Sequence, residues 1–599
     1  MGVILHDVFF GFVYCLTPTK EIIMLHRKLI ATLIATLFVA ACGSAQQNVS
    51  SSNQAAEAAA TVEYTTEYRM ESRMEAPLAP TPAIAEFKRA RPAPATKQAV
   101  MFGSRDSYIG AHSPTGHFGS VQAENTEKYG KIDPNPVKSV AEEAVSTFSI
   151  DVDTGSYANL RRFLNSGSLP PQNAVRIEEL INYFDYNYAL PRDNHPFAVH
   201  TEVVDSPFKT DAKLLKIGIQ AKDLQVKELP AANLVFLVDV SGSMHEPNKL
   251  PLVQKTLRIL TEQLRPQDKV TLITYAGDER VVLEPTSGSQ KDVILKAIDN
   301  LQAGGSTAGE QGIRRAYAEA QKAFIKGGIN RILLATDGDF NVGITDFDTL
   351  KNLIEEKRKT GISLTTLGYG TGNYNEHLME QAADAGDGNY SYIDNEQEAK
   401  KVLHRQLSST LATVAQDVKI QVEFNPATVQ EYRLIGYENR ALKQEDFNND
   451  KVDAGDIGAG HNVTAIYEFI PTGKQGWLDN SRYQTANKTS GSLKEYAFVK
   501  LRYKNPNQKQ SILLEQPIAV GSKSLNQANA DTRWAVAVAA YGQRLQGDKY
   551  NGNLSWDGIA QLAQSAAKPD EFGERAEFLQ LLNKARELSS DGKKVMESR

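Results

Sequence analysis

The sequence predicts an α/β protein, in which a doubly wound, Rossmann-like domain is inserted in a β-sandwich. Between residues 231 and 405, short apolar runs of strand length alternate with amphipathic helical patterns, which is typical of a largely parallel sheet covered by helices. On both sides of this unit, segments of alternating polar and apolar residues indicate half-buried strands. We therefore expect strands from before and after the unit to pair into one sandwich. A disordered N-terminal tether and a C-terminal helical region complete the predicted architecture.

Hydrophobic periodicity predicts each element of the central unit. One helix, for example, carries an apolar stripe at Leu250, Val253, Leu257, Leu260 and Leu264. We expect strands at 233–240, 270–275, 280–284, 331–336, 362–369 and 390–393, and helices at 249–265, 290–301, 309–326, 346–359 and 376–385.

The flanking regions divide into an N-terminal part at 141–230, a sandwich part at 406–525 and a helical part at 526–599. We expect strands at 146–151, 197–203, 214–219, 418–424, 463–469, 496–503 and 511–515, and helices at 156–164, 175–184, 532–545 and 556–588. Ser156 is the expected cap of the first of these helices.

Polar side chains gather where three segments of the central unit turn. Asp239, Ser241 and Ser243 follow a buried strand, Thr307 lies in a glycine-rich turn, and Asp337 follows another buried strand. Ligands of open α/β sheets bind outside the carboxyl ends of the strands. Carboxylate and hydroxyl oxygens suit Mg²⁺ or Mn²⁺. The pattern therefore predicts a divalent-metal site at this edge.

The order and spacing of these residues resemble the metal-ion-dependent adhesion site (MIDAS) of von Willebrand factor type A domains. The resemblance implies that Ser241 and Ser243 ligate the cation directly, with Thr307 as a third hydroxyl ligand in one of two states. It also implies that Asp239 and Asp337 act mostly through bound waters. A partner protein would complete the coordination with an Asp or Glu, because a cation among neutral hydroxyls stays electrophilic.

The start of the chain predicts export. A basic stretch beginning at Met24 precedes a short apolar run, and Val39-Ala40-Ala41-Cys42 resembles the bacterial lipobox. We expect Met24 to be the natural start after a misassigned segment 1–23, residues 24–41 to be a signal peptide, and Cys42 to be lipidated. Because Gly43 follows the cysteine, we expect an anchor in the outer membrane of a bacterial cell envelope.

The composition of the chain narrows the range of possible functions further. Residues 42–140 are rich in Ala, Gln, Ser, Pro and Thr, which predicts a disordered tether with a reach of about 50–60 Å. The only cysteines are Cys15 and Cys42, so we expect no disulfide or thiolate chemistry in the folded part. A net charge of −6 gives no basic surface for nucleic acid, and export makes a nucleotide partner unexpected.

Two stretches, Phe148 to Asn159 and Arg176 to Tyr186, are similar to the N-terminal region of bacterial type A domain lipoproteins of the YfbK kind. Tyr432 to Arg440 is similar to that family's C-terminal domain, and the likeness covers about 140–590. Within it, Asp153-Thr154-Gly155-Ser156 also matches the catalytic loop of aspartic proteases, but the sequence has no second such loop.

We therefore expect a non-enzymatic envelope lipoprotein that binds a protein through a divalent cation. The alternative is a structural or assembly factor in which the metal only stabilises its loop. An aspartic protease is a remote alternative.

Overall fold

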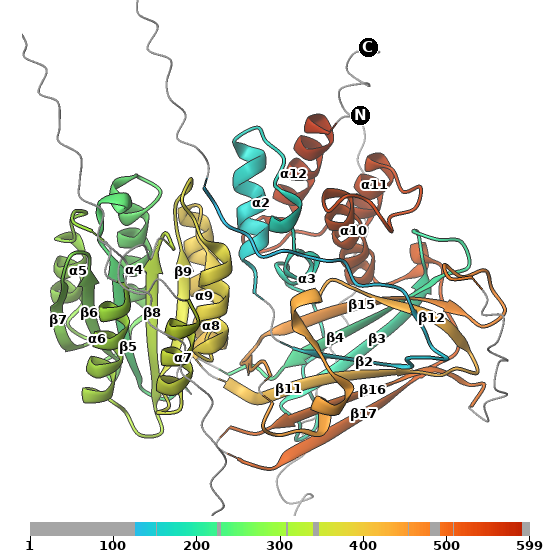
Figure 1. Ribbon diagram of the computed structural model, residues 1–599, viewed down its shortest axis with the longest axis horizontal. Coiled ribbons are helices and arrows are strands. Elements are labelled where there is room, and N and C mark those ends of the chain that lie inside the picture. Colours follow the sequence, from blue (N-terminus) through green and yellow to red (C-terminus); the bar gives the residue numbers. More distant parts are fainter. Residues whose placement is uncertain are drawn as a thin grey trace, which may run out of the picture. The chain divides into compact units, whose positions relative to one another are not determined.

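The central α/β domain, from β5 to α9, has one six-stranded sheet between two layers of helices in the computed structural model (Figure 1). The structure describes residues 126–150, 153–224, 229–306, 309–338, 347–411, 413–452, 454–479, 492–506 and 508–589.

The strand order of this sheet is β10-β9-β8-β5-β6-β7. The strands are β5 (Ala232–Asp239), β6 (Lys269–Tyr275), β7 (Glu279–Ser287), β8 (Ile329–Thr336), β9 (Ser363–Gly368) and β10 (Tyr390–Tyr392). All neighbours pair in parallel except β7, which runs antiparallel to β6 at the edge. The carboxyl ends of β5, β6, β8 and β9 therefore lie along one edge of the sheet.

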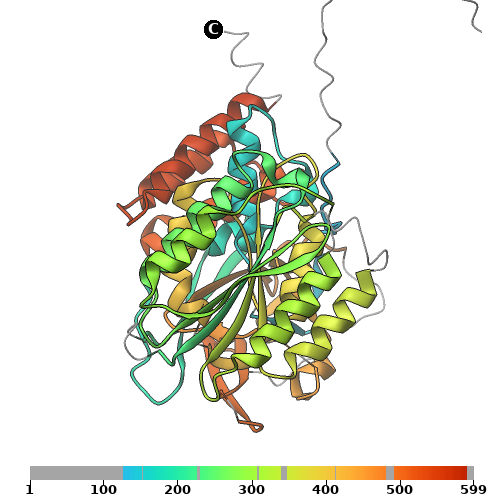
Figure 2. The same ribbon diagram turned by 90° about the vertical axis from the view of Figure 1, so that its left-hand side faces the viewer.

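Helices cover both faces of the sheet (Figure 2) because successive strand residues point to opposite sides. Phe236 and Leu333 belong to the core beneath one set of helices, and Val235 and Leu334 to the core beneath the other. The first set is α4 (Leu250–Gln263), α5 (Lys291–Asp299) and α9 (Glu396–Leu411). The second set is α6 (Gly309–Lys322), α7 (Phe347–Arg358) and α8 (Glu376–Ala385).

Two further sheets combine strands from before and after the central domain. The first has the order β1-β12-β15-β4-β3, with β1 (Lys138–Ser139), β3 (Phe197–Asp205), β4 (Lys213–Ala221), β12 (Val429–Ile435) and β15 (Asn462–Pro471). The second has the order β13-β2-β11-β16-β17, with β2 (Val145–Ser149), β11 (Thr413–Phe424), β13 (Ala441–Leu442), β16 (Glu495–Lys504) and β17 (Ser511–Ala519), and β14 (Ile457–Gly458) pairs with β11. Their facing side chains share one apolar core, which makes a β-sandwich.

A helical layer covers the outer face of the first sheet. Along β4, Leu215 and Ile217 point into the sandwich core, whereas Leu214 belongs to the core under the helices. These helices are α2 (Gly155–Asn165), α3 (Ile177–Asn182), α10 (Ala530–Leu545), α11 (Trp556–Ala566) and α12 (Glu574–Leu588). The sandwich and this layer together are called the scaffold below.

The predicted fold class is confirmed: a doubly wound α/β domain is inserted in a β-sandwich that carries a C-terminal helical region. The predicted tether, 42–140, lies outside the described residues as far as residue 125. Its last part, 126–140, is described and carries β1, which pairs with β12, so these residues belong to the folded part and not to a tether. Where one helix was expected at 556–588 there are two, because Pro569 and Gly573, the latter at φ 71°, interrupt the pattern. No helix was expected after the strand at 390–393, but α9 follows β10 and ends two residues before β11 begins.

Ser156 does not cap its helix, which begins at Gly155 after Thr154. Its hydroxyl instead donates to the Ala174 carbonyl at 2.7 Å and accepts from the Arg176 N–H at 2.9 Å. No helix of the described ranges is both long and apolar enough to cross a membrane.

We predict that Phe148→Ala lowers the free energy of unfolding by about 3–5 kcal/mol, because it leaves a cavity at the centre of the sandwich. Phe148 is fully buried on β2, and its ring lies 4.9 Å from that of Tyr437. Denaturant unfolding measures the loss. Leu513→Ala on β17, which is 46% exposed, is the control and should cost less than about 1 kcal/mol. Equal losses in the two variants would contradict the packing of Phe148 in the sandwich core.

Candidate metal site

Asp239 ends β5 and is fully buried at the carboxyl edge of the central sheet. Its Oδ1 accepts from the backbone N–H of Ser241 at 2.9 Å. Its Oδ2 accepts from the hydroxyl of Thr336, at the end of β8, at 2.9 Å, and from that of Tyr275, at the end of β6, at 3.4 Å. The three neighbouring strand ends thus fix this carboxylate.

Ser241 and Ser243 lie on the loop that follows β5, with their Oγ atoms 3.0 Å apart. Ser241 is buried and Ser243 is half-buried. The loop is held beside the glycine-rich turn, because the N–H of Gly242 donates to the carbonyl of Gly305 at 3.0 Å. Thr307, two residues further on, lies outside the described residues.

Asp337 follows β8 and is also fully buried. Its Oδ2 accepts from the ammonium of Lys249 at 2.9 Å and from the amide of Asn373 at 3.0 Å. Lys249 also donates to Oδ1 of Asn373 at 2.9 Å, so the three side chains close a triangle of hydrogen bonds. Lys249 immediately precedes α4, and Asn373 comes from the loop between β9 and α8.

The carboxylates and hydroxyls at this edge fit a hard divalent cation. Burial raises the pKa of Asp239 to about 6, and the neighbouring negative charge of Asp337 is the second cause. A divalent cation would stabilise such a pair of like charges. The described residues contain no cluster of three or more His, Cys, Asp or Glu that could hold a metal, so a cation here also needs the serine hydroxyls.

The structure brings four of the five predicted metal-site residues to one edge of the sheet: Asp239, Ser241, Ser243 and Asp337. Sequence reasoning missed Lys249 and Asn373. The sequence pattern could have identified Asn373, since this residue follows a predicted strand and therefore reaches the same edge of the sheet. No sequence pattern could have identified Lys249, because a lysine beside an amphipathic helix is normally exposed.

Three family models match the chain. The model of the von Willebrand factor type A domain matches residues 233–405, that of the C-terminal region of uncharacterized protein YfbK matches 409–588, and one described as von Willebrand factor matches 123–216. Uncharacterized protein YfbK of Escherichia coli (strain K12) is 50% identical over 469 residues, which cover 77% of this chain and 81% of that protein. The chain belongs to the YfbK family. Its central α/β domain is a von Willebrand factor type A domain.

More distant similarity extends beyond the YfbK family. Uncharacterized protein sll0103 of Synechocystis sp. is 30% identical over 212 residues, 35% of this chain and 49% of that protein. Among solved structures, von Willebrand factor type A from Catenulispora acidiphila is similar at 16% identity and a TM-score of 0.38, covering 67% of this chain and 91% of that one. The ArnB paralog VWA2 from Sulfolobus acidocaldarius is similar at 14% identity and a TM-score of 0.33, covering 66% and 99%.

Asp153, in the segment that resembles a protease loop, is a structural residue at the boundary between the type A domain and the scaffold. It is buried, and its Oδ1 accepts from the N–H of Tyr390 at 2.8 Å. Its Oδ2 accepts from Arg440 at 2.9 Å. At Gly155, a Cβ would lie 2.3 Å from the Tyr390 ring, so the glycine permits this close approach. The match to the protease loop therefore reflects packing between the two parts.

Three arginines of the scaffold form ion pairs with the type A domain: Arg161 and Arg176, which are buried, and Arg440, which is half-buried. Their partners there are Glu376, Glu380, Asp384, Asp394 and Glu398. Because each buried charge needs its partner, these contacts constrain how the two parts meet.

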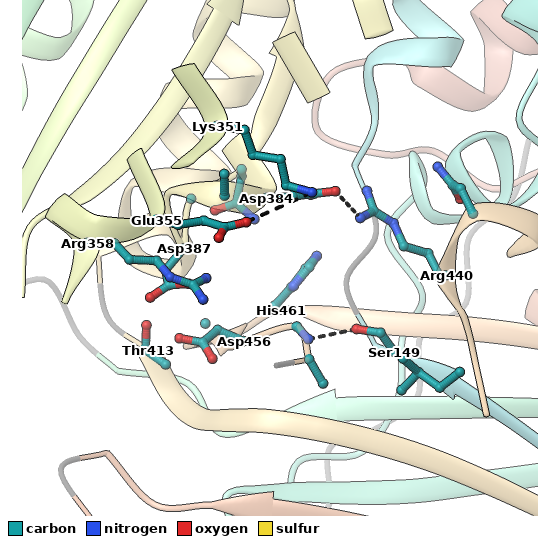
Figure 3. A pocket seen from close by; sticks show the side chains of 18 of the residues that line it. Ser149, Lys351, Glu355, Arg358, Asp384, Asp387, Thr413, Arg440, Asp456 and His461 are labelled. Carbon is teal, nitrogen blue, oxygen red and sulfur yellow. Dashed lines mark hydrogen bonds and ion pairs between the residues drawn. The ribbon is translucent and has the colours of Figure 1, made fainter. Parts of the chain in front are cut away.

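A polar pocket of about 360 Å³ lies between the type A domain and the scaffold (Figure 3). Lys351, Glu355 and Arg358 line it from α7, and Asp456 and His461 line it from the scaffold. Arg331, near the start of β8, also lines it, and burial lowers the pKa of its guanidinium to about 10. Since Asp239 lies at the opposite ends of these parallel strands, the pocket is separate from the candidate metal site.

Glu178 on α3 is a buried carboxyl group near the arginine contacts. Among the described residues, its Oε2 has no hydrogen-bond partner. Burial, with the charge of Glu438 as a second cause, raises its pKa to about 7. The folded state therefore holds the proton of Glu178 at pH values where the unfolded chain has lost it.

We predict that Glu178→Gln removes part of the pH dependence of stability. Since the pKa of the wild-type group is raised in the folded state, its stabilising contribution is complete below about pH 4.5 and is lost as the pH rises through about 7. The stability of the variant relative to wild type should thus increase by about 1–3 kcal/mol between pH 5 and 8. Denaturant unfolding at several pH values measures it.

Glu396→Gln on α9 is the control, because Lys400 lowers the pKa of this exposed carboxyl group. It should give no such relative gain as the pH rises. A pH profile of Glu178→Gln parallel to that of wild type would show that the buried group does not titrate as described.

Proposed function

We propose that this chain is a cell-envelope lipoprotein that binds a protein partner through a divalent cation, Mg²⁺ or Mn²⁺, at Asp239, Ser241, Ser243, Thr307 and Asp337. The observation that carries the proposal is the juxtaposition of two buried carboxylates with a pair of serine hydroxyls 3.0 Å apart, all at the carboxyl edge of a type A domain sheet. The proposed activity is binding without catalysis.

The residues of the site have separate tasks. In the proposed site, Ser241, Ser243 and Thr307 would hold the cation through neutral hydroxyls, and Asp239 and Asp337 would balance its charge through bound waters. When bound, the cation supplies an electrophilic position that an Asp or Glu of the partner completes. The strand-end contacts of Asp239 keep its carboxylate fixed, so little ordering is needed on binding.

The proposed location depends on the leader. Cys42, which lies outside the described residues, would carry the lipid after removal of residues 24–41. The anchor would be in the bacterial outer membrane, and the part of the predicted tether that precedes residue 126 would hold the type A domain away from the lipid surface.

We predict that Mg²⁺ or Mn²⁺ raises the thermal stability of the full chain and that Ser241→Ala/Ser243→Ala abolishes this effect. A ligand of the native state stabilises it by RT ln(1 + [L]/Kd), about 2.7 kcal/mol at a hundredfold excess over Kd. A thermal-unfolding titration with each cation measures the shift.

The matched control is Ser287→Ala/Ser289→Ala. These residues also form a Ser-Gly-Ser segment with hydroxyls 3.0 Å apart, but at the exposed end of β7. This variant should keep the full shift. No shift for wild type up to millimolar cation would contradict the proposed metal site.

We predict that partner binding requires both the cation and Thr307. Cross-linking of the full chain in envelope preparations should give a complex that a chelator removes, that Mg²⁺ restores and that Thr307→Ala weakens. If Thr307→Ala leaves the complex unchanged although metal binding is altered, the scaffold makes the contacts and the protein is instead a structural or assembly factor.

A further inference from the structure

The candidate metal site contains a buried positive charge of its own. Lys249 is only 4% exposed, and its ammonium donates to Oδ2 of Asp337 and to Oδ1 of Asn373, both at 2.9 Å. We propose that Lys249 is a built-in cation that holds the site in shape when no divalent cation is bound and weakens the binding of that cation. This inference rests on the proposed function, because it concerns the regulation of the same site.

The fold is shaped to admit this lysine. Gly370, at φ 82°, passes so close to the side chain that a Cβ there would lie 2.3 Å from Cε of Lys249. Any other residue at 370 would therefore displace the aliphatic chain and would also be strained at that φ. The lysine is thus enclosed along its length, unlike a surface lysine that swings onto a nearby carboxylate.

The triangle of Lys249, Asp337 and Asn373 joins three segments at the edge of the sheet: the start of α4, the end of β8, and the loop between β9 and α8. Without a positive partner, the fully buried Asp337 would be an uncompensated charge, which is strongly destabilising. Lys249 supplies that partner in the metal-free protein. The site should therefore keep its shape without metal.

The same ammonium opposes metal binding. A divalent cation that interacts with Asp337 comes close to Nζ of Lys249, and the repulsion is screened little because both side chains are buried. Lys249 also occupies Oδ2 of Asp337 as a hydrogen-bond donor. Removing the charge should thus tighten divalent binding at least tenfold, although it destabilises the metal-free protein.

Isothermal titration calorimetry with Mg²⁺ and with Mn²⁺, alongside thermal unfolding, tests the proposal on the full chain. Lys249→Met removes the charge and the donor, and Lys249→Gln removes the charge but keeps a donor. We expect both variants to bind the cation at least tenfold more tightly than wild type, and Lys249→Met to unfold at a lower temperature without metal. Lys255→Met, on the same helix but with its side chain 59% exposed, should match wild type in both measurements.

Equal or weaker cation binding by both Lys249 variants, with wild-type binding intact, would overturn this inference and leave the proposed function standing. Binding by the variants but not by wild type would support it, because the lysine would then exclude the cation. No binding by any of these proteins would overturn both the inference and the proposed metal site.

Discussion

Pairing between strands on either side of the type A domain is the constraint on which the rest of the structure depends. Strand β2 pairs with β11, placing Phe148 opposite Ile420, and β4 pairs with β15, placing Ile217 opposite Ala465. Neither flanking region can complete these sheets alone, so the scaffold forms only when both ends of the type A domain come together. Because β11 follows α9 almost directly, this closure also limits where the domain can lie.

Buried ion pairs also determine the orientation of the type A domain on the scaffold. Arg161 donates to Glu398 at 2.7 Å, and Arg176 forms an ion pair with Glu380 at 2.9 Å. Desolvating each of these buried ions costs several kcal/mol. Such pairs contribute little net stability, but a misplaced domain would leave them unpaired at a high cost. The contacts therefore select one arrangement of the type A domain on the scaffold, and apolar packing supplies the stability.

Features that depend on a local pattern could be predicted from the sequence. The alternation of strands and helices gave the fold class, and Asp239 and Asp337 follow buried strands whose parallel direction requires them to share an edge. Features that depend on distant segments could not be predicted. The burial of Lys249 is decided by Gly370 and Asn373, more than a hundred residues away. Likewise, nothing near Asp153 in the sequence indicates its contact with Tyr390.

The charge balance of the site gives the buried lysine a role in partner binding as well as in metal binding. Asp239 and Asp337 with Lys249 carry a net charge of about minus one when both carboxylates are ionised, and a divalent cation would change this to about plus one. Without the ammonium, the loaded site would be neutral and would attract a partner's carboxylate only through its local field. Within the proposed function, Lys249 thus lowers the affinity of the site for the metal. In return, the metal-loaded site keeps a positive charge, which an Asp or Glu of the partner neutralises. A site with a third carboxylate would bind the cation more tightly and the partner less well, which is consistent with the use of hydroxyl ligands here.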